Sequence, residues 1–175
     1  MVANHPIEIR KAVETDAEAL SQLGRSTYAE TYGAFLKAES VALHLANTYT
    51  PEIQRAEIKD PRRRIEIAWS GSEAIGYLQL FEETPPACVP GEKPLKLQRL
   101  YVDKKWHGRK VGALLMDRGL AIAHAEDFKT MWLSVWQKNP RAQAFYRKYA
   151  FTIVGTELFK VGDLFEKNDL LARAL

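Results

Sequence analysis

The stretch Gln98-Arg-Leu-Tyr-Val-Asp-Lys-Lys-Trp-His-Gly-Arg-Lys-Val-Gly-Ala-Leu-Leu115 decides how this chain folds and what it can bind. It runs from an apolar strand, through a basic turn that contains glycine, into an amphipathic helix. Such a turn directs several backbone N–H groups and the positive end of the helix into one small space. The stretch therefore predicts a site for a diphosphate group.

Composition limits the classes of protein that fit. The chain has 175 residues, of which 46% are hydrophobic, and this predicts a single domain over 1–175. The net charge of +3 is too small to indicate a nucleic-acid binder. Cys88 is the only cysteine, so no disulfide can form within the chain. Because no apolar run is long enough for a membrane and no signal peptide is recognisable, we expect a cytoplasmic protein without a membrane partner.

Strand and helix patterns alternate along the rest of the chain. We expect strands at 7–10, 64–69, 74–81, 95–102, 131–135, 151–159 and 168–172, and helices at 15–33, 40–49, 51–60, 108–124 and 139–149. Asn139-Pro140 is a typical helix start, and Gly162-Asp163 is expected to turn the chain before the last strand. The order predicts an α/β fold with a mixed sheet and helices on both faces.

The basic turn has the sequence His107-Gly-Arg-Lys-Val-Gly-Ala113. It lacks the Gly-Lys-Ser/Thr ending of a P-loop and the three glycines of a dinucleotide fingerprint. Taken alone, it fits an ordinary strand-to-helix turn as well as a phosphate site. A second motif, Asn139-Pro-Arg-Ala142-Gln-Ala-Phe145-Tyr146, makes the pair of motifs much more specific.

With both motifs, the chain resembles the GNAT superfamily of N-acetyltransferases over essentially its whole length, most strongly over 96–159. After the fourth strand, members carry Gln/Arg-x-x-Gly-x-Gly/Ala. His107, Lys110 and Gly112 occupy these three positions, so lysine replaces the middle glycine. A lysine fits there if its φ is helical. The resemblance implies the acyl-CoA N-acyltransferase fold, with a mixed, mostly antiparallel sheet.

The second family pattern is Asn-x-x-Ala-x-x-x-Tyr before Gly-Phe. Asn139, Ala142 and Tyr146 match it, while Ala150-Phe151 replaces Gly-Phe. In the mechanism that the resemblance implies, Tyr146 donates a proton to the departing CoA thiolate, and Asn139 hydrogen-bonds near the pantetheine or the acceptor. These two are the expected catalytic residues.

The resemblance also implies acetyl-CoA as the cosubstrate, with no metal. The backbone of residues 100–102, at the end of the expected strand, would pair with the pantetheine arm, and an N–H group there would polarise the thioester carbonyl. The basic turn would hold the pyrophosphate. The residues implied for cofactor binding are Leu100, Tyr101, Val102, His107, Gly108, Arg109, Lys110, Val111, Gly112, Ala113, Asn139 and Tyr146.

Within the superfamily, the chain is most similar to bacterial spermidine/spermine N-acetyltransferases. This is carried by Thr27-Tyr-Ala-Glu-Thr-Tyr32 and by Trp132-Leu-Ser-Val-Trp136-Gln-Lys-Asn139. A polyamine-like primary amine is therefore the first expected acceptor, although Lys96 and Gln98 stand where those enzymes tend to carry carboxylates. The expected acceptor pocket contains Glu30, Tyr32 and Glu82.

The general base is not evident from the sequence, and Glu30, Glu82, Glu83 or a chain of waters could serve. Two other functions stay open: a non-catalytic acyl-CoA-binding regulatory domain, and an acetyltransferase that acts on a peptide or protein amine. A homodimer also stays open. The histidines lack the spacing of metal ligands, so no metal site is expected.

Overall fold

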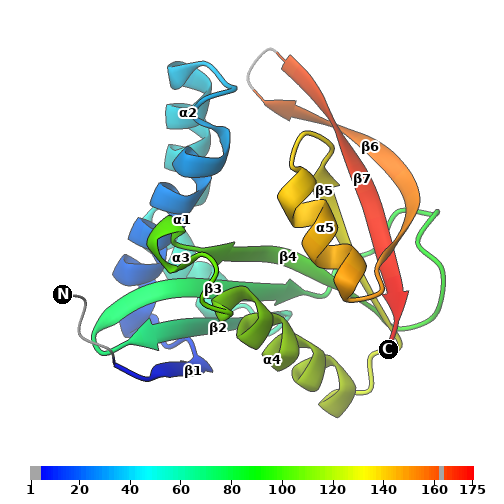
Figure 1. Cartoon of the computed structure of the whole chain (residues 1–175), viewed down its shortest axis with the longest axis horizontal. Coiled ribbons are helices and arrows are strands. Elements are labelled where there is room, and N and C mark those ends of the chain that lie inside the picture. The colour runs from blue at the N-terminus through cyan, green and yellow to red at the C-terminus, as the bar shows by residue number, and fades with distance from the viewer. Residues whose placement is uncertain (1–4, 162–163) are drawn as a thin grey trace. The chain divides into compact units, whose positions relative to one another are not determined.

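The structure is a computed structural model that describes residues 5–161 and 164–175, so the turn expected at Gly162-Asp163 lies outside the described residues. The strands are β1 (Ile7–Lys11), β2 (Arg63–Ser70), β3 (Glu73–Phe81), β4 (Pro94–Val102), β5 (Thr130–Trp136), β6 (Thr152–Val161) and β7 (Leu164–Ala174) (Figure 1). The helices are α1 (Ala17–Tyr32), α2 (Ala38–Thr48), α3 (Pro51–Lys59), α4 (Val111–Ala125) and α5 (Pro140–Lys148), with two 3₁₀ turns, Glu14–Asp16 and Lys104–Trp106.

The strands pair in the order β1-β2-β3-β4-β5-β7-β6. Pairing is antiparallel between β1 and β2, between β5 and β7, and between β6 and β7, whereas β4 and β5 are parallel. The mixed, mostly antiparallel α/β fold is thus confirmed. The chain divides into two compact units: unit 1 contains residues 1–80 and 99–119, and unit 2 contains residues 81–98 and 120–175. The expectation of one domain over 1–175 stays a prediction.

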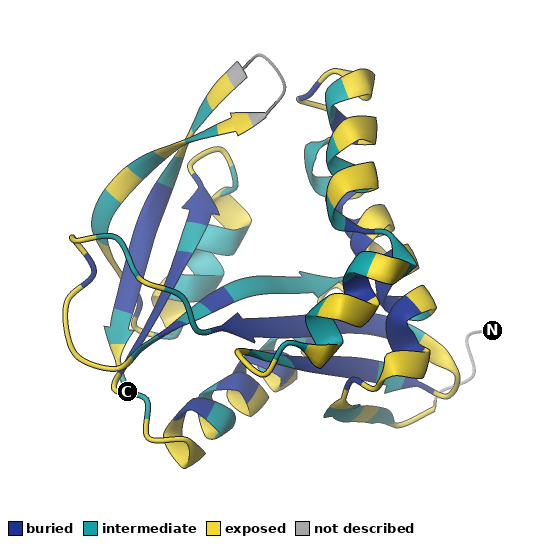
Figure 2. Cartoon of the chain, turned by 180° about the vertical axis from the view of Figure 1, so that it is seen from behind, coloured by how far each residue is buried: buried dark blue, intermediate teal, exposed yellow. Residues whose placement is uncertain are grey.

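In unit 1, α1 and α3 cover one face of the strands. Leu20 and Leu23 of α1 pack with Ile65 and Ile67 of β2 and Tyr77 of β3 in one buried cluster. Alternation along the strands brings these side chains to the same face, because residues two apart in a strand point the same way. Figure 2 shows the buried strands of this unit beneath helices whose outer sides are exposed.

The opposite face of unit 1 receives α4. A Cβ on Gly119 would lie 3.0 Å from the Leu78 side chain, and one on Gly76 would lie 3.2 Å from the Leu115 side chain. Helix and strand therefore approach closely through their glycines. Helices cover both faces of the strands in this unit, as expected from the order of elements.

In unit 2, α5 accompanies the β5-β7-β6 strands. Gln137, just after β5, donates a hydrogen bond from Nε2 to Asp169 Oδ1 of β7 at 2.7 Å, and the Gln143 amide of α5 reaches the other carboxylate oxygen at 3.5 Å. A register shift between Ile153 and Gly155 bends β6. These contacts fix the first turn of α5 relative to its own strands.

The expected elements are all present, although several begin or end at other residues than expected. β7, for example, begins at Leu164 rather than at residue 168. The helix expected from 108 begins at Val111, because the chain first makes a 3₁₀ turn at Lys104–Trp106 and then a further turn over 107–110. These extra turns lie in the stretch expected to bind a diphosphate.

Candidate active site

The segment after β4 is folded tightly by its own backbone. The Asp103 N–H donates to the Ile75 carbonyl of β3 at 2.9 Å, which ties the end of β4 to its neighbour. The Asp103 carboxylate then accepts the Lys105 N–H at 2.8 Å, and the Asp103 carbonyl accepts the Trp106 N–H at 2.8 Å. Trp106 is buried by this turn and anchors it in unit 1.

The next four residues, His107 to Lys110, are all exposed, and Arg109 and Lys110 among them carry positive charge. His107 Nε2 donates to the Val102 carbonyl at 2.9 Å, which places the ring proton on Nε2 and joins the turn to the end of β4. Arg109 lies with its guanidinium carbon 4.9 Å from the centre of the Trp106 ring. Gly108 has a φ of +79°, a conformation that glycine adopts without strain.

Lys110 does not meet the condition under which a lysine fits this position easily, which is a helical φ. Its φ is +64°, in the left-handed region that favours glycine. The backbone therefore keeps the shape of a glycine turn although the side chain has changed. The exposed lysine side chain adds positive charge at the start of α4.

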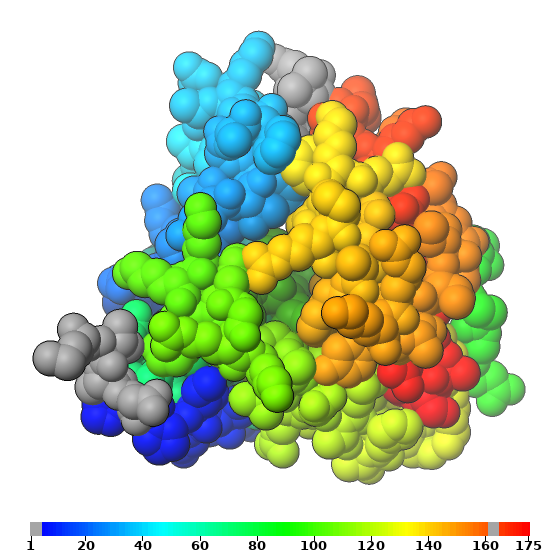
Figure 3. All heavy atoms as spheres, viewed as in Figure 1, coloured from blue at the N-terminus to red at the C-terminus, as the bar shows by residue number. Residues whose placement is uncertain are grey.

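The N-terminus of α4 follows directly. Leu114 donates to the Lys110 carbonyl at 3.0 Å, which is the first α-helical bond at this end. The N–H groups of a first helical turn have no carbonyl within the helix, and the helix dipole makes this end positive. Lys104, Lys105 and Arg109, in the segment just before it, are exposed. The segment after β4, drawn in green, lies at the molecular surface (Figure 3). This part of unit 1 can hold an anionic group.

β4, the strand that leads into this turn, pairs with β5 over only a few residues. The parallel register of β4 with β5 comprises Pro94 to Lys96 of β4, each paired with one residue of 130–132. Leu100, Tyr101 and Val102, which were expected to pair with pantetheine, lie beyond this register and are half-buried. They belong to unit 1, together with all of 107–113.

Asn139 lies in unit 2 and caps α5. Its side-chain oxygen accepts the Ala142 N–H at 3.1 Å, and Pro140 occupies the first helical turn. Its own N–H donates to the Trp136 carbonyl at 3.0 Å. The helix start predicted from Asn139-Pro140 is confirmed, and a role for Asn139 in the reaction stays a prediction.

Tyr146 lies near the end of α5 in unit 2. It is half-buried, and its ring contacts the Phe145 ring at 5.5 Å and the Phe151 ring at 5.8 Å between centroids. Ala150, which replaces the family glycine, has a φ of +60°. As with Lys110, the glycine-like backbone is retained while the side chain differs.

The acceptor residues expected from the sequence are divided between the two units, and their role stays a prediction. Glu30 is exposed on α1, and Tyr32 packs its ring 4.5 Å from that of Tyr28, both in unit 1. Glu82 belongs to unit 2 and is half-buried. Glu83, one of the candidate bases, forms an ion pair with Lys96.

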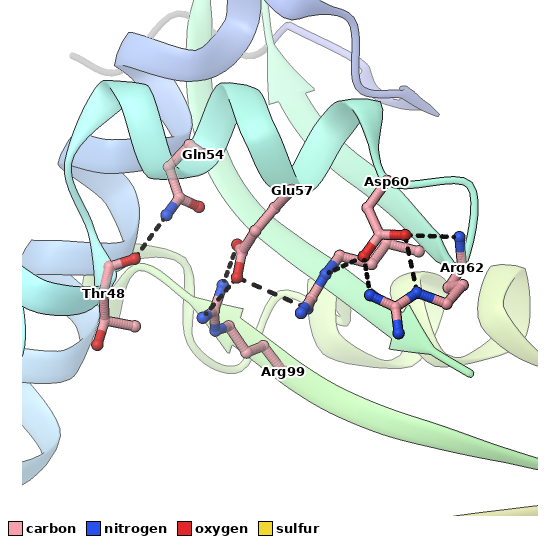
Figure 4. A network of polar contacts seen from close by, with 7 residues as sticks. Thr48, Gln54, Glu57, Asp60, Arg62 and Arg99 are labelled. Atoms are coloured by element: carbon pink, nitrogen blue, oxygen red, sulfur yellow. Dashed lines mark hydrogen bonds and ion pairs between the residues drawn. The ribbon is translucent and has the colours of Figure 1, made fainter. Parts of the chain in front are cut away.

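Sequence reasoning missed a buried ion pair in unit 1. Arg99 of β4 donates from both terminal nitrogens to the carboxylate of Glu57 of α3, at 2.6 and 3.2 Å (Figure 4). The two side chains are only 9% and 12% exposed. The nearby Gln54 amide donates to the Thr48 carbonyl at 2.8 Å. The partners are 42 residues apart, and no local pattern signals such a pair.

An aromatic cluster lies beside this pair in the same unit. The His44 ring stacks on the Tyr28 ring with centroids 4.1 Å apart, and Tyr49 lies edge-on to His44 at 5.9 Å. The Arg99 guanidinium lies 5.0 Å from the centre of the Tyr49 ring. Burial, together with the charge of Arg99, lowers the pKa of His44. Burial also raises the pKa of Tyr28 to about 12, with a smaller contribution from Tyr101.

The comparisons with known proteins agree with the fold. The sequence pattern of the acetyltransferase (GNAT) family matches residues 27–151. The chain belongs to this family and is an acetyltransferase.

Its relatives include an uncharacterized N-acetyltransferase of Mycobacterium tuberculosis, 30% identical over 161 residues that cover 92% of this chain and 99% of the relative. The spermidine N(1)-acetyltransferase of Thermoplasma acidophilum is 26% identical over 151 residues, covering 86% and 91% of the two chains. Among solved structures, the PaiA N-acetyltransferase of Thermoplasma acidophilum in complex with coenzyme A has a TM-score of 0.80 at 22% identity, covering 97% of this chain and 99% of that one.

The described residues contain no group of three or more His, Cys, Asp or Glu residues that could hold a metal ion. Within residues 5–161 and 164–175, no helix combines the length and the apolar character needed to cross a membrane.

Proposed function

We propose that this acetyltransferase moves the acetyl group of acetyl-CoA to a primary amine of a small molecule. The observation that carries the proposal is the cationic turn between β4 and α4. Its exposed residues Lys104, Lys105 and Arg109 precede the N-terminus of α4 within a few residues, and such a cationic segment before a helix start suits the pyrophosphate of CoA. The fit with CoA chemistry is supported by the CoA complex of the structurally similar PaiA protein.

In the proposed reaction, the amine nitrogen attacks the thioester carbonyl carbon directly, and the bond from that carbon to sulfur breaks. The backbone of Leu100 to Val102 binds the pantetheine arm and orients the thioester. Tyr146 donates a proton to the leaving thiolate. This role is proposed from the family pattern Asn139, Ala142, Tyr146.

A polyamine is the first acceptor to test. Its support is the named activity of the Thermoplasma acidophilum spermidine N(1)-acetyltransferase. Glu30, which is exposed on α1, is proposed to attract a cationic acceptor in solution. Charge attraction of this kind weakens as salt is added.

The test is an amine panel incubated with acetyl-CoA, with release of the CoA thiol as the readout. We expect turnover of spermidine to exceed that of neutral amines, with an advantage that shrinks at high salt. Turnover of a peptide N-terminus in place of spermidine would redirect the proposal to a peptide acceptor. CoA binding without transfer to any amine would instead favour a non-catalytic acyl-CoA-binding domain.

A further inference from the structure

We propose that His44 of α2 is the general base that removes the proton from the acceptor ammonium. This inference rests on the proposed function and supplies the proton acceptor that the sequence did not reveal. An alkylammonium has a pKa of about 10, so at neutral pH only about one amine in a thousand is free to attack. A nearby base therefore has a large effect on the rate.

The ring of His44 is held in place by ring contacts, not by hydrogen bonds to its nitrogens. Stacking on Tyr28 at 4.1 Å, with only 15° between the ring planes, fixes its orientation, and Tyr49 supports its edge. Within the described residues neither ring nitrogen has a hydrogen-bond partner, and the residue is half-buried. In the described residues, the ring nitrogen that carries the lone pair is therefore not engaged by another protein group.

The surroundings of His44 contain a polar atom that lacks a partner. The Tyr28 hydroxyl is buried without a hydrogen bond, although the residue is only 3% exposed. Buried hydroxyls are normally satisfied, so the Tyr28 hydroxyl indicates that a polar group of a ligand or a water belongs beside this cluster.

This cluster adjoins the strand proposed to bind the cofactor. The Tyr77 ring lies 5.7 Å from the ring of Tyr101, which stands between Leu100 and Val102 in β4. The Tyr49 ring contacts Arg99 of the same strand. An amine bound beside these residues would lie next to the strand that orients the thioester.

The charges around the ring favour a neutral imidazole. The titratable groups of the cluster are Tyr28 and Tyr32 from α1, Tyr49 after α2, Tyr77 from β3, Arg99 and Tyr101 from β4, and Glu57 from α3. The Glu57 carboxylate is engaged by Arg99, so it does not compete as a base. Burial and Arg99 lower the pKa of His44 below its ordinary 6.5, and the imidazole is the basic form at neutral pH.

The proposed step balances as follows in atoms and charge. One N–H bond of the ammonium breaks and its proton moves to the free ring nitrogen of His44. The freed amine nitrogen forms the bond to the acetyl carbon as the bond from that carbon to sulfur breaks, and the thiolate takes a proton from Tyr146. The nitrogen then loses its second proton to solvent, which leaves the neutral amide, and the Tyr146 phenolate takes a proton back from solvent. His44 returns its own proton to solvent, so one proton is released for each amide formed.

The experiment compares wild type, His44→Gln, His44→Ala and the control His124→Gln, which alters an exposed histidine near the end of α4. The readouts are kcat/KM from pH 5.5 to 9 and the Kd for acetyl-CoA. We expect wild-type kcat/KM to level off above about pH 6.5. In His44→Gln it should be about 100-fold lower at pH 7 and rise tenfold per pH unit, with unchanged Kd. Added imidazole should restore part of the His44→Ala rate, and His124→Gln should match wild type.

The experiment distinguishes a failure of the role proposed for His44 from a failure of the proposed function. If His44→Gln keeps the wild-type rate and pH profile, or if imidazole does not rescue His44→Ala, the inference is wrong while the proposed function stands. If wild type binds acetyl-CoA but acetylates no amine, the proposed function fails, and the role of His44 fails with it.

Discussion

Tyr146 and Phe151 are joined twice at the end of α5. The Phe151 N–H donates to the Tyr146 carbonyl at 3.2 Å, and the two rings meet edge-to-face with their centroids 5.8 Å apart. The Ala150 N–H donates to the Arg147 carbonyl at 3.0 Å, which completes a Schellman motif with the 150th residue in the left-handed region. The end of the helix thus sets the position of the tyrosine ring.

From this relationship we expect Tyr146→Phe to lower kcat about 100-fold while the Kd for CoA stays unchanged. The change deletes only the hydroxyl, so the ring contact with Phe151 survives. Tyr149→Phe, one residue after α5, is the matched control and should retain its activity. Stopped assays of thiol release, with calorimetry for CoA, measure both quantities. Equal turnover in wild type and Tyr146→Phe would make Tyr146 a packing residue only.

Ala150→Gly should raise the free energy of unfolding by about 1 kcal/mol, because glycine adopts a φ of +60° without a Cβ clash. Ala144→Gly, the same change inside α5, should lower it by about 1 kcal/mol. Urea denaturation of wild type and both variants measures the two changes in the free energy of unfolding and shows whether they have opposite signs. A loss of stability in Ala150→Gly would contradict the left-handed conformation at this position.

The basic turn predicts a contrast between two changes. Lys110→Gly should keep CoA binding and raise stability, since the φ of Lys110 is +64°. Gly112→Glu should weaken CoA binding at least tenfold, because a carboxylate in the first turn of α4 repels a pyrophosphate. The same carboxylate favours the helix N-terminus, so the fold should persist.

Gly112→Gln is the neutral control of equal size, and it separates charge from bulk. Calorimetric titration with CoA at two salt concentrations measures the effect. If Lys110→Gly abolished binding, the ammonium of Lys110 would be the phosphate ligand, and the backbone N–H groups of the turn would not be sufficient to bind CoA.

The buried pair of Glu57 and Arg99 predicts strong coupling. Glu57→Gln should destabilise the protein by about 3 kcal/mol, because it leaves a buried guanidinium without its carboxylate. Glu57→Gln with Arg99→Met should recover part of this loss. The exposed pair of Lys59 and Glu14 offers the control, and Lys59→Met should cost less than about 1 kcal/mol. Additive losses in the double variant would show that the two side chains are not coupled.

Local chemistry in the sequence was enough to locate most elements. Asn139 and Pro140 start α5 because their side chains favour the first helical turn wherever they occur. The strand, basic turn and helix of 98–115 are likewise predicted by the pattern of residues that are neighbours in the chain. The exact start of α4 was not predicted, because the preceding 3₁₀ turn depends on two hydrogen bonds of Asp103. Its N–H donates to Ile75 of β3, and its carboxylate accepts the N–H of Lys105.

The left-handed residues show where sequence reasoning stops. Lys110 and Ala150 have left the glycine pattern of the family, and a lysine or alanine does not itself indicate a positive φ. The conformation persists because the surrounding turn and helix end impose it. The Schellman bonds around Ala150 are one such constraint.

The sequence by itself determined the order of strands and helices, the cationic turn and the family motifs, because each depends on residues that are close in the chain. Only the tertiary structure decided which distant groups meet. It joined Glu57 to Arg99, stacked His44 on Tyr28, and paired Glu83, a candidate base, with Lys96. Such contacts depend on how strands and helices pack, and burial then alters the chemistry, as it does when it lowers the pKa of His44.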